Sequence, residues 1–187
     1  MTHRLDDIIA LFDGLFLSRY RTRLISGEDE PLYLPADDVV PYHRVIFAHG
    51  FYASALHEIS HWCIAGDRRR QLEDYGYWYQ PDGRDAEQQQ VFESVEVAPQ
   101  ALELLFSRAC LHPFNVSVDN LGGPEVDRAR FRERVEARAA RYEAEGVPTR
   151  AEAFRQMLKA FYQQQASRTD AIHIGKQWLR SRQELRV

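Results

Sequence analysis

The chain has 187 residues, a formal net charge of −4, 44% hydrophobic residues and two cysteines. This length favours a single domain, residues 1–187, and the hydrophobic content excludes an intrinsically disordered chain. The charge gives no general case for nucleic-acid binding, no apolar run is long enough to span a membrane, and Cys63 and Cys110 lie in apolar segments typical of a reduced core. We therefore expect a soluble cytoplasmic protein that binds neither nucleic acid nor membranes.

The first third of the chain predicts a helix, a small sheet and a second helix. Apolar residues recur at helical spacing over Leu5–Phe16. Three short extended segments follow, at Thr22–Ile25, Leu32–Leu34 and Arg44–Ala48, and turn-rich loops separate them. After a glycine break, the pattern of Phe51–Ala65 predicts an apolar helix.

The next part of the chain predicts mainly helices. Tyr75–Asp85 is rich in aromatic residues and indicates either a half-buried strand or the wall of a pocket. Ala86–Leu111 is mostly helical, with Pro99 expected to start a second segment, and Asn115–Val118 is expected to form a short strand. Val126–Glu145 is expected to be a long helix with a charged, solvated face.

A last helix is expected from Thr149, as its capping residue, to about Gln164. The tail from Ala166 onward is basic, and its apolar residues show only weak patterning. Together these elements predict an α+β fold in one domain, with a small sheet and several helices.

The helix predicted after the third extended segment contains the motif H-E-x-x-H. On a helix, His57 and His61 are one turn apart and project from the same face, so two imidazoles can bind one divalent transition metal. Glu58 lies about 100° round the helix, beside such a metal. The alternative is a pair of core histidines that each bond a backbone carbonyl, but burying two imidazoles without a shared partner is costly.

Two histidines leave a metal site incomplete, so a third ligand is expected. The zinc-protease continuation with glycine and a third histidine is absent, because Ile64 and Asp67 occupy those positions. Glu96 is the best candidate, because it lies between two valines and a buried carboxylate needs a cation or donors. Other candidates are Glu73, Asp74 and Glu93, of which Glu93 is also a candidate to orient a histidine, and more weakly His49.

These residues are compatible with two chemistries and one structural role. Zinc would make Glu58 the general base of a metallopeptidase, whereas ferrous iron would give the facial triad of oxygenases that bind dioxygen. A closed four-ligand site, completed by His49 or Cys63, would instead indicate a non-catalytic adaptor. Just beyond the motif, the basic run Arg68–Arg70 is either a solvated surface or a docking patch for an acidic partner.

Longer stretches of the sequence resemble the elongation factor P hydroxylase family of small bacterial proteins. The longest is the stretch AHGFYASALHEISHWCIAG at Ala48–Gly66. The other matching segments are Thr22–Ile25, Glu30–Asp37, Gly76–Tyr79, Pro81–Ala86, Val95–Val97, Pro99–Leu102, Pro113–Ser117 and Asp119–Leu121. The resemblance extends over most of the chain and is densest between Thr22 and Asn120.

The resemblance implies a non-haem Fe²⁺ enzyme that uses dioxygen to hydroxylate the β-lysylated lysine of elongation factor P, the last step of its modification. It also implies a zincin-like fold, similar to that of zinc metalloproteases. The metal triad would be His57, His61 and a glutamate, which maps to Glu96, and Glu58 would lie beside the metal or face the substrate.

The lysine-based arm of such a substrate is long and carries ammonium groups. We expect carboxylates to attract these cations and aromatic rings to contact the methylene groups of the arm. The residues predicted to bind the substrate are Asp82, Asp119, Tyr52 and Trp78, with Asp85, Trp62 and Tyr77 as further candidates.

Overall fold

The computed structural model describes residues 2–77, 82–118, 120–123 and 125–184. Within them, the small sheet has the strand order β1-β3-β2. The strands are β1 (Thr22–Ser26), β2 (Leu32–Leu34) and β3 (His43–Phe47), which confirms the three predicted extended segments to within one residue at each end. β3 pairs in parallel with β1 and antiparallel with β2.

One face of this sheet is buried. Val45 on the central strand lies opposite Leu24 of β1 and opposite Tyr33 of β2. Each of these three residues is 1% exposed. Because side chains alternate across a strand, this cross-strand row fixes which face turns toward the helices.

The helices form the larger part of the described fold. They are α1 (Leu5–Tyr20), α2 (Tyr52–Ile64), α3 (Ala86–Cys110), α4 (Arg128–Glu145), α5 (Thr149–Leu158) and α6 (Arg168–Glu184). Short 3₁₀ turns occur at Arg69–Gln71 and Glu73–Gly76, and a π-helical turn, Lys159–Gln163, continues α5. The expected α+β class is confirmed, and none of the described helices is both long and apolar enough to cross a bilayer.

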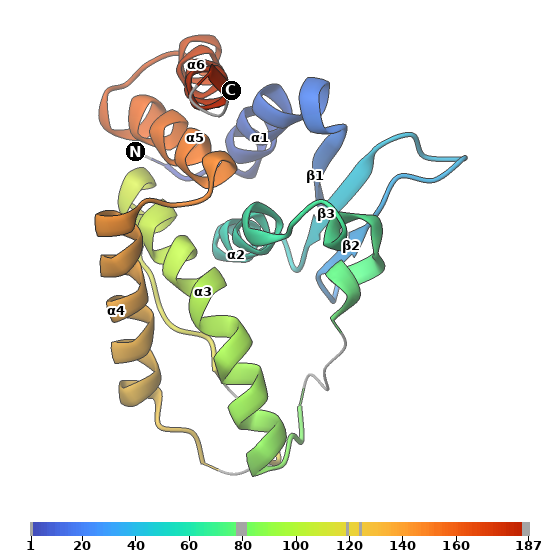
Figure 1. Cartoon of the computed structure of the whole chain (residues 1–187), viewed down its shortest axis with the longest axis vertical. Coiled ribbons are helices and arrows are strands. Elements are labelled where there is room, and N and C mark those ends of the chain that lie inside the picture. The colour runs from blue at the N-terminus through green and yellow to red at the C-terminus, as the bar shows by residue number, and fades with distance from the viewer. Residues whose placement is uncertain (1, 78–81, 119, 124, 185–187) are drawn as a thin grey trace.

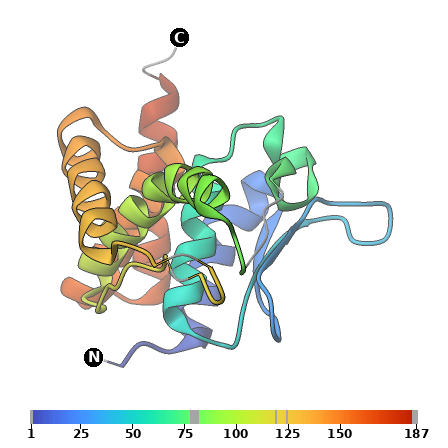
Figure 2. The same cartoon turned by 90° about the horizontal axis from the view of Figure 1, so that it is seen from below.

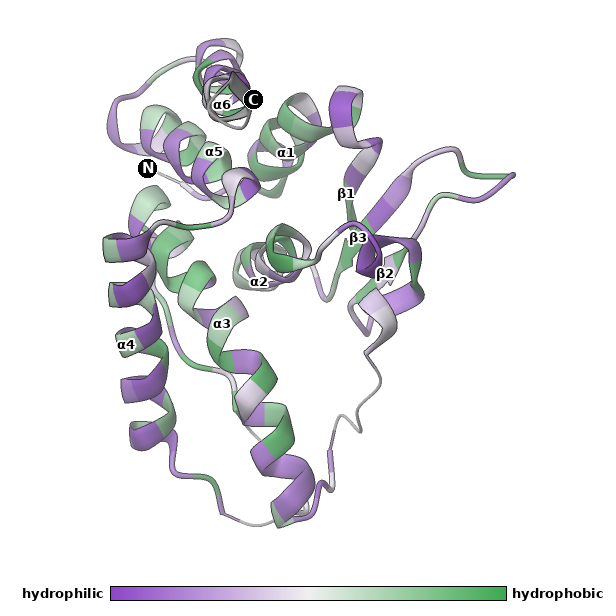
Figure 3. Ribbon diagram, viewed as in Figure 1, coloured by the Kyte–Doolittle hydropathy of each residue, from purple (hydrophilic) through white to green (hydrophobic). Residues whose placement is uncertain are grey.

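Helix α2 lies between the sheet and the long helix α3 (Figures 1 and 2). Helix α4 runs alongside α3 on the side away from the sheet, and α5, α6 and α1 gather at one end of the molecule. Hydrophobic residues concentrate on α1 and on the C-terminal half of α3, whereas α4 is largely hydrophilic (Figure 3). The solvated face expected for α4 is therefore present.

The back of α2 is fixed by an aromatic cluster. Trp62 is fully buried, and its ring centroid lies 5.3 Å from that of Phe12 and 4.7 Å from that of Phe16. Phe154 of α5 packs against both phenylalanines at 6.2 Å. Trp62 therefore anchors the helix in the core, and the expectation that it lines a substrate channel is wrong.

Two local predictions, one within α3 and one for the segment that follows it, are wrong. Pro99 lies inside one continuous helix, although it lacks a backbone N–H, and it is buried. Asn115–Val118 forms no strand, because the side chain of Gln100 satisfies the backbone of Ser117. The Gln100 Oε1 accepts from the Ser117 N–H at 3.0 Å, and its Nε2 donates to the Ser117 carbonyl at 2.6 Å.

Three further segments differ from expectation. The start of Tyr75–Asp85 belongs to a 3₁₀ turn and not to a strand, and residues 78–81 lie outside the described part of the chain. Thr149 is the first residue of α5 and makes no capping bond, because Pro148 precedes the helix at the cap position. The weakly patterned tail forms α6, which packs on α5 and α1 with Ala171 and Leu179 buried.

Candidate metal centre

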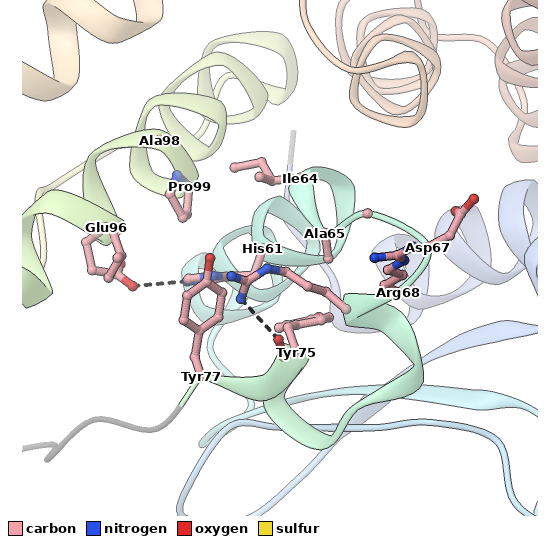
Figure 4. Close-up of a pocket in the computed structure, with 13 residues that line it drawn as sticks. His61, Ile64, Ala65, Asp67, Arg68, Tyr75, Tyr77, Glu96, Ala98 and Pro99 are labelled. Carbon is pink, nitrogen blue, oxygen red and sulfur yellow. Dashed lines mark hydrogen bonds and ion pairs between the residues drawn. The ribbon is translucent and has the colours of Figure 1, made fainter.

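Three donor side chains meet between α2 and α3. The Nε2 atoms of His57 and His61 are 3.1 Å apart. The Glu96 carboxylate faces both, with Oε2 3.4 Å from His57 Nε2 and Oε1 3.2 Å from His61 Nε2. The close-up in Figure 4 shows Glu96 reaching from α3 toward His61 on α2. The predicted pair of histidines and the predicted third ligand are thus brought together, and in the described residues they are the one group with metal-ligand spacing.

The spacing of these atoms suits a metal ion. With bonds of about 2.1 Å, ligand atoms are about 3.0 Å apart at right angles and about 3.4 Å apart at tetrahedral angles. The three observed separations, 3.1, 3.2 and 3.4 Å, lie across this range. Glu96 is 2% exposed, and its Oε1 is buried without a hydrogen-bond donor. A buried carboxylate oxygen without a donor, facing two imidazole nitrogens, is what a metal site with three protein ligands requires.

A second glutamate of α3 orients the first histidine. Glu103 Oε2 lies 2.8 Å from His57 Nδ1, so this nitrogen donates its proton to the carboxylate and Nε2 is turned toward Glu96. Glu103 is buried. A carboxylate behind a metal-binding histidine fixes the ring and raises its basicity.

The sequence analysis missed Glu103, although a signal was present. Glu103 is a charged residue inside the apolar run Leu102–Phe106, and it is seven residues after Glu96. Seven residues are two helical turns, so the two carboxylates share one face of α3.

The charges of the centre stabilise one another in the absence of a metal. Burial alone would raise the pKa of Glu96, but the two histidines and Gln100 lower it to about 2. Burial alone would lower the pKa of His57, but Glu103 and Glu96 raise it to about 10. The carboxylates and the imidazoles therefore attract one another, and a metal ion that binds His57 competes with a proton for the ring nitrogen.

Glu58 lies beside the triad without a place in it. Burial raises the pKa of its carboxyl group, and the neighbouring His57 and His61 oppose that rise. Close by, Tyr75 is buried, its ring is nearly parallel to that of His61 at 6.5 Å, and its hydroxyl has no hydrogen-bond partner among the described residues. Tyr75 belongs to a turn in which Asp74, Tyr75 and Gly76 all have positive φ, a conformation that non-glycine residues rarely adopt.

A pocket of about 560 Å³ leads to the metal triad. One wall comes from α3, with Val95, Ala98 and Pro99, and the other from the end of α2 and the turns after it (Figure 4). His61 and Glu96 lie at its inner end, whereas Arg68, Arg69 and Tyr77 also line it. Its volume is within the range of small-molecule sites, and the walls near the triad are mostly apolar.

Two comparisons with known proteins identify the family of this chain. The model of the family described as elongation factor P hydroxylase (EpmC) matches residues 11–172. A curated relative from Haemophilus influenzae, named elongation factor P lysine hydroxylase, is 51% identical over 176 residues, which cover 94% of this chain and 97% of the relative. This chain belongs to the elongation factor P hydroxylase family. The resemblance inferred from the sequence is thereby confirmed.

In this family member, the other ligand candidates are engaged elsewhere. Glu93 pairs with Arg134 of α4 at 2.9 Å, so it does not orient a histidine. The Asp74 carboxylate accepts the backbone N–H of Tyr33 at 2.8 Å, and Glu73 is exposed.

The closed site of a non-catalytic adaptor is not formed by the described residues. His49 is exposed against Phe51, and Cys63 is a free, buried thiol beside Arg150, so neither joins the group that contains the two motif histidines and Glu96. A metal held by three protein ligands would keep open coordination positions for substrates, as catalytic sites require.

The residues predicted to bind the substrate are not gathered at the pocket. Tyr52 is buried in a cluster with His3 and His112, and its hydroxyl lies 2.8 Å from that of Tyr162. Asp82 is exposed, and its carboxylate accepts the backbone N–H of Leu121 at 2.9 Å. Asp85 caps α3. Trp78 and Asp119 lie outside the described residues, so of these aromatic and acidic candidates only Tyr77 is found on the pocket wall.

Proposed function

We propose that this protein is a lysine hydroxylase of elongation factor P that works with non-haem Fe²⁺ bound by His57, His61 and Glu96. The observation that carries this proposal is the convergence of these three donors, of which His61 and Glu96 line a pocket, in a member of this family. The relative from Haemophilus influenzae carries the name of this activity. Bound iron would supply the activation of dioxygen, the cosubstrate, because two histidines and one carboxylate leave coordination positions open.

The residues around the proposed iron site have separate tasks. Glu103 holds the His57 ring through Nδ1 and leaves Nε2 free for the metal. Gln100 donates to Glu96 Oε2 at 3.3 Å and steadies the third ligand. Glu58 is the half-buried carboxylate available to hold or move a proton beside the metal, as its position after His57 predicts.

The pocket suits a long aliphatic arm with polar groups. Ile64, Val95 and Pro99 offer apolar contacts to methylene groups along the wall. We propose that the arm is the lysine of elongation factor P after β-lysylation, because this extension would let a side chain reach a recessed metal. We also propose that residues 1–187 form one hydroxylase domain of the zincin-like type, which the helix with H-E-x-x-H beside a small sheet supports.

A zinc metallopeptidase would use the same residues differently. It would need Zn²⁺ at the triad and Glu58 as the general base that activates water. Family membership favours hydroxylation over peptide hydrolysis.

The two activities are separated by loading the protein with Fe²⁺ or Zn²⁺. Each form is incubated with β-lysylated elongation factor P, oxygen and a reductant, and the modified peptide is analysed by mass spectrometry. We expect the iron form to add one oxygen atom to the lysine arm and the zinc form to add none. Peptide cleavage by the zinc form, with no oxygen added by the iron form, would reject the proposal.

A further inference from the structure

Arg69 is a cation held in place at the mouth of the pocket. It lines the pocket, and its Nη1 donates to the Tyr75 carbonyl at 3.2 Å. Its guanidinium carbon lies 4.0 Å from the centroid of the Tyr77 ring. These two contacts fix a side chain that would otherwise sample many rotamers, so less conformational entropy is lost when it binds a further group.

Among the described residues, no carboxylate forms an ion pair with Arg69. Its neighbour Arg70 forms an ion pair with Asp67. In the part of the chain that the structure describes, neither Arg68 nor Arg69 forms an ion pair with a carboxylate. Both are exposed, and both line the pocket. The mouth of the pocket is therefore cationic, in a protein whose net charge is −4.

The inner end of the pocket has the opposite character. Glu96 lines this end, and Glu103 and Glu58 lie beyond the pocket wall around the two histidines, so three carboxylates surround a site for one divalent ion. A cationic lysine arm is matched by this inner end and repelled by the arginines at the mouth. The arginines are therefore complementary in charge to another part of the ligand. This part carries negative charge and stays at the surface of the pocket.

We propose that Arg69, together with Arg68, docks acidic side chains that flank the modified lysine on the substrate protein. This inference rests on the proposed function, because that function makes the ligand a protein carrying a cationic arm. A guanidinium binds a carboxylate through two parallel hydrogen bonds. Such a contact at the rim selects for a lysine in an acidic surface and places its arm over the pocket.

The first test compares Arg69→Gln with Arg69→Lys in the iron-loaded enzyme. Glutamine keeps a donor for the Tyr75 carbonyl and removes the charge, whereas lysine keeps the charge. Arg132→Gln on α4 is the matched control, because Arg132 is exposed and pairs with Glu136 of its own helix, away from the pocket. We expect Arg69→Gln to raise KM by about tenfold with kcat within twofold, and Arg69→Lys and the control to remain within about threefold of wild type.

The second test measures binding without turnover. Iron-loaded protein without oxygen is titrated calorimetrically with β-lysylated elongation factor P at low and high salt. Docking predicts that salt weakens binding to wild type more than to Arg69→Gln, because exposed charges are screened. Equal salt dependence of the two proteins, or a fall in kcat with unchanged KM, would overturn the inference.

The experiments distinguish failure of the proposed function from failure of the docking proposal. If wild type adds no oxygen, the proposed function fails, and the titration still tests docking. If wild type hydroxylates its substrate and Arg69→Gln matches it in KM and in affinity, docking by Arg69 is rejected and the proposed function stands.

Discussion

The carboxylate of Glu103 lies 2.8 Å from Nδ1 of His57, and this contact sets the direction in which the histidine offers its other nitrogen. Glu103 and the metal-binding candidate Glu96 lie on one helix and face His57 from two sides. The metal centre is thus assembled by the contact of two helices, with the ligand and its support spaced two turns apart on α3.

Removing the support of His57 should weaken metal binding. Glu103→Ala is expected to lower metal affinity by about 10–100-fold, because the ring loses the partner that orients it. Glu103→Gln should have a smaller effect, since an amide oxygen still accepts from Nδ1. Titration against a competing chelator measures the change, and Glu143→Gln on the exposed face of α4 is the control. Unchanged affinity in Glu103→Ala would show that the contact has no role in metal binding.

Glu58 should matter for turnover and not for metal content. Glu58→Gln keeps the size of the side chain and removes the group that can hold a proton beside the triad. A proton-transfer group contributes about 10²–10⁴-fold to a rate, so we expect at least a hundredfold fall in kcat. Metal analysis of the same sample should give wild-type content. Loss of metal in this variant would instead make Glu58 part of the ligand set.

Arg150 should stabilise the fold from the far side of the metal helix. It is 9% exposed, donates to the Cys63 and Ala65 carbonyls at the end of α2, and places its guanidinium 4.6 Å from the Trp62 ring. Arg150→Met leaves those carbonyls without this donor and should lower the free energy of unfolding by about 2–3 kcal/mol.

Urea denaturation measures this loss, with Arg130→Met on the exposed surface of α4 as the control. The control should change stability by less than about 0.5 kcal/mol. A loss in Arg150→Met no larger than that of the control would mean that the buried guanidinium does not stabilise the end of α2.

His43 should make stability depend on pH below neutrality. Its Nδ1 accepts the Ala36 N–H at 3.1 Å, so the folded state needs the unprotonated nitrogen. Burial, followed by the charges of Arg70 and Arg21, lowers its pKa from 6.5. Because the folded pKa lies below the unfolded one, this contribution is complete above pH 6.5 and is lost as the pH falls through the folded value.

The variant His43→Asn tests the assignment, because an amide oxygen replaces Nδ1 as acceptor and does not titrate. Chemical denaturation at several pH values between 7 and 5 should show a shallower loss of stability in the variant. Identical pH profiles for the two proteins would exclude His43 as a source of the dependence.

Regular patterns in the sequence predicted most of the elements. Short extended segments between turn-rich loops, such as Thr22–Ile25 and Arg44–Ala48, identified the strands, and the H-E-x-x-H spacing identified the face of α2 that carries the candidate metal ligands. Glu96 was predictable because a carboxylate between two valines is expected to be buried, and a buried carboxylate needs a cation or hydrogen-bond donors. Such signals depend on residues that are close in sequence, which is why they are visible without a structure.

The features that the sequence did not predict depend on contacts between distant segments. The sequence of Asn115–Val118 resembles a strand, but the side chain of Gln100 binds the backbone of Ser117, and the segment pairs with none of the described strands. The interior position of Pro99 depends on packing of α3 that no local pattern specifies. Helix α6, whose sequence is weakly patterned, packs against α1, where Gly14 lets Ile172 approach closely. Asp82 was expected at the substrate, but its carboxylate joins two loops.

The most direct test of the metal centre compares two glutamates one turn apart on α3. Glu96→Ala and Glu93→Ala are loaded with Fe²⁺, analysed for bound metal, and incubated with β-lysylated elongation factor P, oxygen and a reductant. The proposed triad predicts that Glu96→Ala loses both iron and the added oxygen atom, whereas Glu93→Ala keeps both. Full iron content and hydroxylation in Glu96→Ala would contradict the triad, and with it the account of how this fold carries out the reaction.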